Sequence, residues 1–214
     1  AEPEGVPILQ RNLANFLCSM GEAPGCARDD VLCSATTLSF DIAALELYLP
    51  LICGAQVVIA DDAEHRVPEA LCRLIERHRC TMFQTTPSLM ALLQEVGRTQ
   101  VLAPLRLLVG GEALPLPLAR TLHGQCRELW NMYGPTETTV WSSLHRIDGG
   151  ENAVPLGQPI ARTRFYLLDD RQRPALPHAL GEIWIGGAGV ADGYLHRPDL
   201  SGERFVPDSF AADG

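Results

Sequence analysis

Hydrophobic and polar residues follow one another in short blocks along residues 55–133, with helical spacing in some blocks and strand-like runs in others. Residues 67–79 (VPEALCRLIERHR) place apolar side chains on one helical stripe, and Pro68 stands in the first turn, where proline is tolerated. Helices are also predicted over residues 87–96 and 115–124. Short apolar runs predict strands over residues 55–60, 80–85, 105–111 and 126–132.

This alternation of strands and helices predicts right-handed βαβ units on a mostly parallel sheet with flanking helices. After about residue 150 the pattern changes. Strands are predicted over residues 161–170 and 181–187, and the turn-rich stretch between them leaves no room for a crossover helix. We therefore predict an α/β fold in residues 1–150, followed by an antiparallel, barrel-like subdomain in residues 151–214.

Composition narrows the classes of protein to consider. Apolar residues make up 46% of the 214 positions and charged residues 20%, as in globular proteins. The net charge of −9 argues against a nucleic-acid partner, because phosphates would repel it. The longest apolar run is interrupted by Glu46, Pro50 and Gly54, which argues against a membrane span.

The cysteines indicate a reducing compartment. There are seven, an odd number, and no two are spaced as CxxC. Most lie in apolar runs, as expected for buried, reduced thiols. We therefore expect a cytoplasmic protein.

Glycines, hydroxyls and a carboxylate follow three of the predicted strands, at residues 85–87, 109–115 and 131–139. Ligands of open α/β sheets bind beyond the carboxyl ends of the strands. Gly110 and Gly111 would let a flat group approach the backbone, and Tyr133 could stack on it. The threonines of the third segment suit phosphate, and its glutamate suits Mg²⁺. A capped turn without any ligand explains this segment equally well.

Five segments of the chain share their sequences and their order with one known family. The clearest is NMYGPTETT at residues 131–139. The others are LSFDIAALELYLPLICGAQVVIA (38–60), LLVGGEALP (107–115), PLGQPIARTRFYLLD (155–169) and GEIWIGGAGVADGYLHRPDLSGERF (181–205). They resemble the adenylation domains of nonribosomal peptide synthetases, which are amino-acid-activating members of the adenylate-forming enzymes. Together they extend the resemblance over essentially the whole chain.

The resemblance implies an activity. Such domains join an amino acid to ATP, with Mg²⁺, and pass the aminoacyl group to the phosphopantetheine thiol of a peptidyl carrier domain. A condensation domain of the same megasynthase would be a further partner. The chain would cover the later two-thirds of the large N-terminal domain and lack the small C-terminal one. We therefore expect residues 1–214 alone to be inactive.

The resemblance also assigns residues. Asp41 would pair with the α-ammonium of the amino acid, since a partly desolvated cation needs a charge partner; a helix N-cap is the alternative. Thr136 would contact phosphate and Glu137 would bind Mg²⁺, which makes these two the candidate catalytic residues. On the nucleotide side, Gly111 and Tyr133 would flank adenine and Asn131 would face its edge. Glu112 and Gly134 accompany them in the motifs.

The same resemblance defines a substrate pocket, which includes Asp41 as its single charge. The remaining positions are Ile42, Leu45, Gln84, Leu108, Gly110, Met132, Val140 and Trp141. Bulky side chains such as Trp141 leave little volume, and the lining resembles the glycine type of the family. We therefore expect glycine as substrate, with alanine second. Alternatively, Trp141 and Met132 are core residues that point elsewhere.

Two other functions remain open. An acyl- or aryl-acid ligase of the same superfamily is one, although an acid without an α-amino group has no use for Asp41. A non-catalytic relic or binding module is the other. Its support is Glu4, which stands where the family's phosphate loop usually has lysine and would repel a triphosphate.

Overall fold

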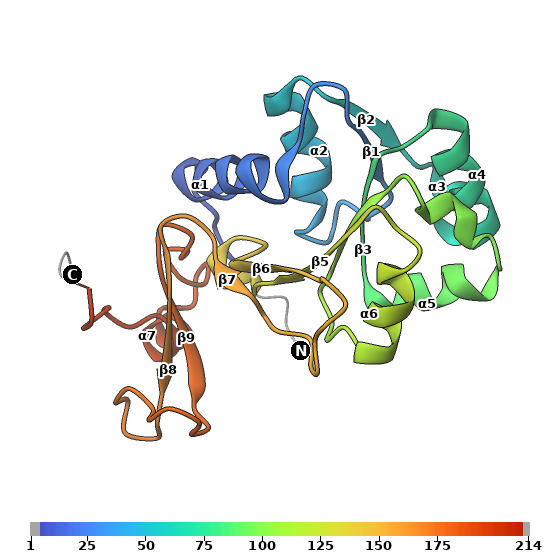
Figure 1. Ribbon diagram of the computed structural model, residues 1–214. Coiled ribbons are helices and arrows are strands. Elements are labelled where there is room, and N and C mark those ends of the chain that lie inside the picture. The colour runs from blue at the N-terminus through green and yellow to red at the C-terminus, as the bar shows by residue number, and fades with distance from the viewer. Residues whose placement is uncertain (1–4, 212–214) are drawn as a thin grey trace.

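The computed structural model describes residues 5–211 (Figure 1). Its α-helices are α1 (Gln10–Met20), α2 (Ala43–Cys53), α3 (Asp62–Arg66), α4 (Pro68–His78), α5 (Pro87–Glu95), α6 (Leu116–His123) and α7 (Pro198–Arg204). Its strands are β1 (Val31–Ser34), β2 (Gln56–Ile59), β3 (Met82–Thr85), β4 (Arg106–Gly110), β5 (Glu128–Tyr133), β6 (Ser143–Arg146), β7 (Gln158–Pro159), β8 (Thr163–Leu168) and β9 (Glu182–Gly187). Short 3₁₀ turns occupy Thr99–Leu102 and Thr136–Thr138.

Seven strands form the main sheet, in the order β2-β1-β3-β4-β5-β6-β7. The pairs from β2 to β5 are parallel, whereas β6 and β7 pair antiparallel. A separate antiparallel pair joins β8 to β9. The predicted α/β fold, with a mostly parallel sheet and a later antiparallel part, is confirmed.

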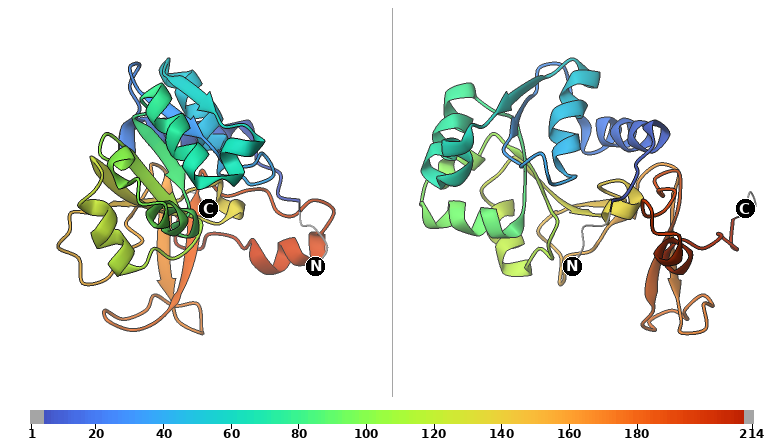
Figure 2. Two further views of the ribbon diagram at one scale, coloured as in Figure 1. Left: turned by 90° about the vertical axis from the view of Figure 1, so that its right-hand side faces the viewer. Right: turned by 180° about the vertical axis from the view of Figure 1, so that it is seen from behind.

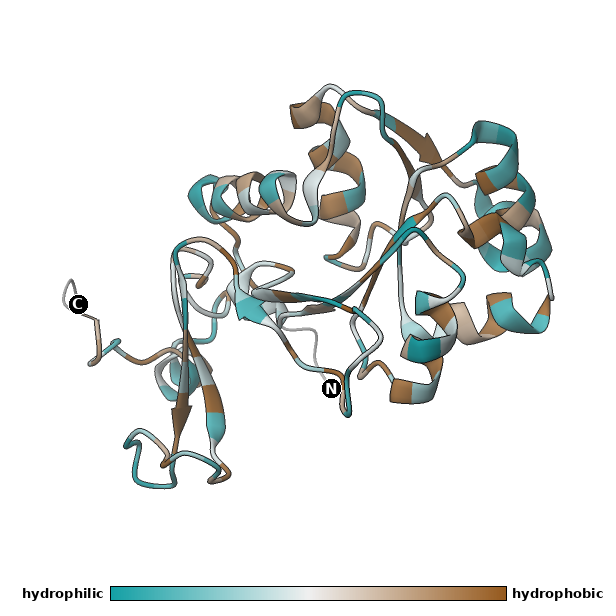
Figure 3. Ribbon diagram, in the orientation of Figure 1, coloured by the Kyte–Doolittle hydropathy of each residue, from teal (hydrophilic) through white to brown (hydrophobic). Residues whose placement is uncertain are grey.

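Helices cover both faces of the main sheet, because successive strand residues point to opposite sides. Phe83 and Leu107 pack with α4, α5 and α6 on one face. Their sequence neighbours Met82 and Leu108 pack with α1 and α2 on the other. Figure 3 shows hydrophobic residues along the central strands, while the outer surfaces of α3 and α4 are largely hydrophilic. Two apolar cores therefore hold the sheet in place.

Two helices of the second core, α1 and α2, are not predicted by the sequence pattern. In α2 nearly every position is apolar, so no polar face reveals a helical period, and Pro50 lies inside the helix. Gly54 ends it in the left-handed conformation (φ +68°) that glycine adopts without strain. Tertiary packing on the sheet, rather than local pattern, thus determines this helix.

The β8–β9 pair stands beside the layered body, with α7 next to it (Figure 2). The last strand of the main sheet, β7, lies after residue 150, so the main sheet extends slightly past the division predicted from the sequence.

All seven cysteines are free thiols; Cys33, Cys72 and Cys80 are buried. Between residues 5 and 211, no helix is long and apolar enough to cross a membrane.

Candidate active site

The carboxyl ends of β3, β4 and β5 meet at one edge of the sheet, because these strands are parallel neighbours. Thr85 ends β3, Gly110 ends β4 and Tyr133 ends β5. Ligands of open α/β sheets bind beyond this edge. The fold therefore brings together the three segments that the sequence marks by glycines, hydroxyls and a carboxylate.

A pocket of ≈ 370 Å³ lies at this edge. It is lined by Gly111, Glu112, Ala113, Leu114, Asn131, Met132, Tyr133, Gly134, Pro135, Val154 and Leu156. Five of the six residues assigned to the nucleotide are among them, and the sixth, Thr136, directly follows the lining residue Pro135. The volume and the mixed lining suit a small organic ligand.

Close contacts explain two glycines of the site, and a left-handed backbone conformation explains a third. A Cβ on Gly110 would lie 2.5 Å from the carbonyl oxygen of Met132 and 2.7 Å from Cη2 of Trp141. A Cβ on Gly134 would lie 2.5 Å from a carbonyl oxygen of the returning chain. Gly111 has a φ of +80°, which side-chain-bearing residues rarely adopt. These positions shape the pocket through the absence of a side chain.

The pocket wall is held by contacts between β5 and later parts of the chain. The ring of Tyr133 meets the ring of Phe165 edge to face, with centroids 6.3 Å apart and planes at 82°. The buried amide of Asn131 donates from Nδ2 to the carbonyl oxygen of Pro155, at 2.8 Å. Asn131 thus fixes the segment 154–156, which closes the far side of the pocket.

Asp41 lies in the turn before α2 and does not cap this helix. The first helical turn has no side-chain cap, and Ile42 occupies the cap position. Instead, the hydroxyl of Thr136 donates to Oδ2 of Asp41 at 2.6 Å. The hydrogen bond places the candidate ammonium-binding carboxylate beside the candidate phosphate-binding hydroxyl.

In the Thr-Glu-Thr-Thr cluster (residues 136–139), the first two side chains and the last two have different partners. Thr138 and Thr139 turn their hydroxyls onto protein atoms, and Thr139 donates to the carbonyl oxygen of Gly189 at 2.7 Å. Thr136 is exposed and Glu137 half-buried. The hydroxyl of Tyr194 donates to Oε1 of Glu137 at 2.5 Å. The last two residues thus anchor the turn, while the side chains of the first two bond to Asp41 and Tyr194.

Seven of the nine residues assigned to the substrate pocket are buried side chains, each at most 5% exposed. They are Ile42, Leu45, Gln84, Leu108, Met132, Val140 and Trp141. All except Gln84 belong to the core cluster between the sheet and α1 and α2. The position of Trp141 against Gly110 nevertheless puts its indole directly at the end of β4.

A buried polar network connects Trp141, Gln84 and Ile42. It also contains Glu46, to which the sequence assigned no role. Nε1 of Trp141 donates to Oε1 of Gln84 at 2.8 Å. Nε2 of Gln84 donates to the carbonyl oxygen of Ile42 and to Oε1 of Glu46, both at 2.8 Å. Burial raises the pKa of the Glu46 carboxyl. The sequence contains one sign of this role, because Glu46 is a carboxylate inside the otherwise apolar stretch 43–53.

The chain reaches Trp141 through an unusual backbone. Thr139 and Val140 both have a φ of +66°, in the left-handed region that β-branched residues disfavour. Strain of this kind costs of order 1–3 kcal/mol per residue and is concentrated at functional sites. The sequence contains no glycine at these positions that would signal the turn.

The carboxylates of the site fit one kind of metal. Within residues 5–211, no three His, Cys, Asp or Glu side chains are grouped to hold an ion by themselves. Mg²⁺ needs no such group, because it binds through one or two carboxylates together with substrate phosphates. The candidate carboxylates are Glu137 and the exposed Glu112, and each accepts a hydrogen bond at 2.5 Å, from Tyr194 and from Ser88 respectively.

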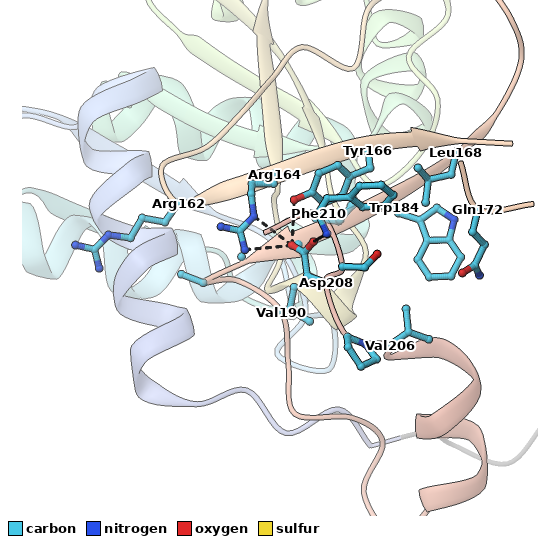
Figure 4. A pocket seen from close by; sticks show the side chains of 16 residues that line it. Arg162, Arg164, Tyr166, Leu168, Gln172, Trp184, Val190, Val206, Asp208 and Phe210 are labelled. Atoms are coloured by element: carbon cyan, nitrogen blue, oxygen red, sulfur yellow. Dashed lines mark hydrogen bonds and ion pairs between the residues drawn. The ribbon is translucent and has the colours of Figure 1, made fainter. Parts of the chain in front are cut away.

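A second pocket, of ≈ 590 Å³, lies against the β8–β9 pair (Figure 4). Asp208 is its charged centre and accepts hydrogen bonds from Arg164 at 3.2 Å and from Tyr166 at 3.1 Å. These bonds, with backbone donors, lower the pKa of Asp208 although its desolvation acts in the opposite direction. None of the predicted site residues lines this pocket.

Comparison with known proteins agrees with this geometry. Residues 1–195 match the family described as "AMP-binding enzyme". The chain belongs to this family. All residues that line the pocket beyond β4 and β5 lie within the matched range.

Similar AMP-binding sequences occur in large synthetases. The chain is 46% identical, over 99% of its length, to a dimodular nonribosomal peptide synthase of Bacillus subtilis, of which it spans 9%. It is 38% identical to the indigoidine synthase of Dickeya dadantii, over 100% of its own length and 15% of that protein. The chain therefore corresponds to a small part of these relatives.

Solved AMP-binding structures show the same fold. A four-domain nonribosomal peptide synthetase bound to AMP and glycine matches with a TM-score of 0.92 and 38% identity, over 97% of this chain and 16% of that one. The N-terminal subdomain of Klebsiella oxytoca NpsA, in complex with 3-hydroxybenzoyl-AMSN, matches with a TM-score of 0.82 and 29% identity. That match covers 96% of this chain and 53% of the other.

Proposed function

We propose that this chain is part of an adenylation domain that activates an amino acid with ATP, giving aminoacyl-AMP and pyrophosphate. The observation that carries the proposal is the joint position of two features. The ≈ 370 Å³ pocket holds Gly111, Asn131 and Tyr133, and the hydrogen-bonded pair of Asp41 and Thr136 lies at the same sheet edge. A nucleotide site next to a charge partner for an ammonium suits this reaction.

In this reaction the carboxylate of the amino acid attacks the α-phosphorus of ATP, and pyrophosphate leaves. No protein nucleophile is needed, so the chain contributes position and charge. Asp41 would hold the α-ammonium, Tyr133 and the Gly111 backbone would enclose adenine, and Thr136 would bind phosphate. Mg²⁺, when bound, supplies positive charge to the phosphates, and Glu137 would hold it.

Glycine is the proposed amino acid, with alanine second. The residues assigned to the substrate side chain are already packed against one another, and Trp141 reaches Gly110. A larger substrate side chain would have to displace buried atoms, and overpacking typically costs about 1–3 kcal/mol. The glycine in the solved synthetase is consistent with this choice.

An aryl-acid ligase is the second candidate function. It is favoured by the similarity to NpsA, whose structure contains a 3-hydroxybenzoyl ligand. Asp41 argues against it here, because a benzoyl group has no ammonium to pair with that carboxylate.

The wider setting is also proposed from the relatives. A peptidyl carrier domain with its phosphopantetheine thiol would receive the aminoacyl group, and a condensation domain would be a further partner in the same cytoplasmic megasynthase. Residues 1–150 would contain the amino-acid and adenylate pocket, apart from its wall at Val154 and Leu156, and residues 151–214 the β-rich part. Glu4, the residue that supports a non-catalytic relic, lies outside the described residues.

Amino-acid-dependent exchange between ATP and pyrophosphate, measured on the full-length parent protein, tests the proposal. Glycine, alanine, leucine and 3-hydroxybenzoate would be compared. We expect the highest kcat/KM with glycine and no exchange from residues 1–214 alone. Highest activity with leucine would contradict the packing argument, activity with 3-hydroxybenzoate alone would favour the aryl-acid ligase, and no exchange with any acid would favour the relic.

A further inference from the structure

Glu46 is a buried carboxylate on α2 for which the proposed reaction has no use. Its side chain is 0% exposed. It accepts hydrogen bonds from the hydroxyl of Ser34 (3.0 Å), the backbone N–H of Thr36 (3.0 Å), the hydroxyl of Thr36 (2.5 Å) and Nε2 of Gln84 (2.8 Å). All these donors are uncharged. A buried carboxylate is costly to maintain, so a role beyond filling space is to be expected.

The surroundings of Gln84 determine which way its amide points. The indole N–H of Trp141 can only donate, so the amide atom that faces it must be oxygen. The carbonyl of Ile42 can only accept, so the opposite amide atom must be nitrogen. The second hydrogen on that nitrogen points to Oε1 of Glu46. Glu46 therefore stabilises the one orientation in which Gln84 can bind Trp141.

The indole of Trp141 is in turn fixed at two points. Its nitrogen is held by Gln84, 2.8 Å away. Its far edge, at Cη2, lies 2.7 Å from the position that a Cβ on Gly110 would take. A small rotation of the indole would change the space at the end of β4, where the substrate side chain is proposed to lie.

We propose that Glu46 is a positioning residue for substrate selection: through Gln84 it holds the Trp141 indole against Gly110 and so limits the size of the accepted side chain. This inference rests on the proposed amino-acid-activating function. It adds a residue that does not itself touch the substrate.

The substitution Glu46→Gln tests the proposal with almost no change in shape. Each carboxylate oxygen of Glu46 accepts from one amide N–H, that of the Thr36 backbone at Oε2 and that of Gln84 Nε2 at Oε1. A glutamine has only one oxygen, so its amino group must face one of these donors. The backbone of Thr36 cannot turn, but the Gln84 amide can. Turning it places a donor against the Trp141 N–H and releases the indole.

The experiment compares kcat/KM for glycine and alanine by pyrophosphate exchange in the full-length protein. One methyl group in a pocket is discriminated by about 10–200-fold. We expect Glu46→Gln to reduce the preference for glycine by about tenfold, with the KM for ATP within twofold of the original. Ser34→Ala is the matched control. It removes another hydrogen bond from the same carboxylate but leaves the amide donors of Thr36 and Gln84 paired, so the preference for glycine should not change.

A double-mutant cycle separates positioning from a general structural effect. Trp141→Phe removes the indole N–H, so adding Glu46→Gln should have no further effect on the preference. Independent effects of the two substitutions, or an unchanged preference in folded Glu46→Gln protein, would overturn the proposal. If Glu46→Gln does not fold, Gln84→Met removes the same connection, and an unchanged preference there would equally overturn it. Absence of exchange in the unsubstituted protein would instead contradict the proposed function.

Discussion

The hydroxyl of Thr136 donates to the carboxylate of Asp41 at 2.6 Å, across 95 positions of sequence. This hydrogen bond joins the loop after β5 to the turn before α2. A carboxylate has two oxygens, so holding Thr136 with Oδ2 leaves Oδ1 for a second donor. The proposed ammonium and phosphate contacts are therefore neighbours, and a change at either residue should affect the other.

Asp41→Asn should weaken amino-acid binding. The substitution keeps the shape but removes the charge that would pair with the α-ammonium. A hydrogen bond to a charged group contributes about 1.5–3 kcal/mol, so the KM for the amino acid should rise about 10- to 100-fold. Pyrophosphate exchange in the full-length protein would measure it. Thr136→Ser is the control, since it retains the hydroxyl; an equal KM rise in both variants would contradict the charge argument.

Tyr194→Phe should increase the Mg²⁺ concentration that the reaction needs. Tyr194 donates to Oε1 of Glu137, the proposed metal-binding carboxylate. Loss of a group that orients a metal ligand typically costs 10–100-fold in affinity. We therefore expect half-maximal exchange at a Mg²⁺ concentration about tenfold higher or more.

Tyr166→Phe is a matched control for this Mg²⁺ experiment. It also removes a tyrosine hydroxyl that donates to a carboxylate, that of Asp208, but beside β8 and β9. Its Mg²⁺ dependence should equal that of the unsubstituted protein. If the two variants behave alike, Tyr194 has no specific connection to metal binding.

The sequence predicts the frame of the fold well because its pattern is local. Helix α4 has apolar residues at helical spacing, and β2, β3, β4 and β5 are short apolar runs bounded by helices, whereas β1 was not predicted. The sequence does not predict α2, because its composition is apolar on all sides and only the sheet defines which face is buried. A polar face makes α4 predictable from its pattern, whereas α2 has no such face.

The site was only partly accessible to sequence reasoning. The glycines and the Thr-Glu-Thr-Thr cluster mark the strand ends, and five of the six residues assigned to the nucleotide line one pocket. The directions of the side chains could not be predicted. Nothing in the sequence indicates that Thr139 turns inward to Gly189, or that Glu137 lies beside Tyr194. These contacts depend on long-range packing between the main sheet and the later segment.

Gly110→Ala should destabilise the protein and impair activity together. The new Cβ would lie 2.5 Å from a backbone oxygen and 2.7 Å from the Trp141 ring. Overpacking of this kind costs about 1–3 kcal/mol. Gly124→Ala is the control, because the nearest atom would be 3.7 Å away and the φ of −75° is ordinary. Urea unfolding should show a lower free energy of unfolding only for Gly110→Ala. Equal free energies of unfolding for the two variants would contradict the predicted overpacking at Gly110.

Arg106→Met should destabilise the protein in a pH-dependent way. The guanidinium contacts Asp30 at 3.5 Å and Glu128 at 3.3 Å, and all three side chains are at most 17% exposed. Burial acts to raise the pKa of each carboxyl, but hydrogen bonds and Arg106 lower it overall. Breaking a buried charge cluster by removing one partner costs about 3–5 kcal/mol, so a loss of that size is expected at pH 7.

The sign of the pH dependence follows from the lowered pKa values. Such carboxyls stabilise the fold above their ordinary pKa values of 3.8 and 4.5, and this stabilisation is lost as the pH falls through the lower folded values. Without Arg106, both carboxyls would protonate more readily. The difference in free energy of unfolding between Arg106→Met and the unsubstituted protein should therefore be largest at pH 7 and shrink below about pH 4.

Urea unfolding at pH 7 and pH 3.5 would measure this difference. Arg98→Met is the control, because its pair with Glu76 is about one-third exposed, at 34% and 36%, and exposed pairs contribute about 0–1 kcal/mol. Its effect should be small at both pH values. A loss for Arg106→Met that is the same at both pH values would mean that Arg106 stabilises the sheet through its hydrogen bond to the carbonyl of Gly25 and not through charge.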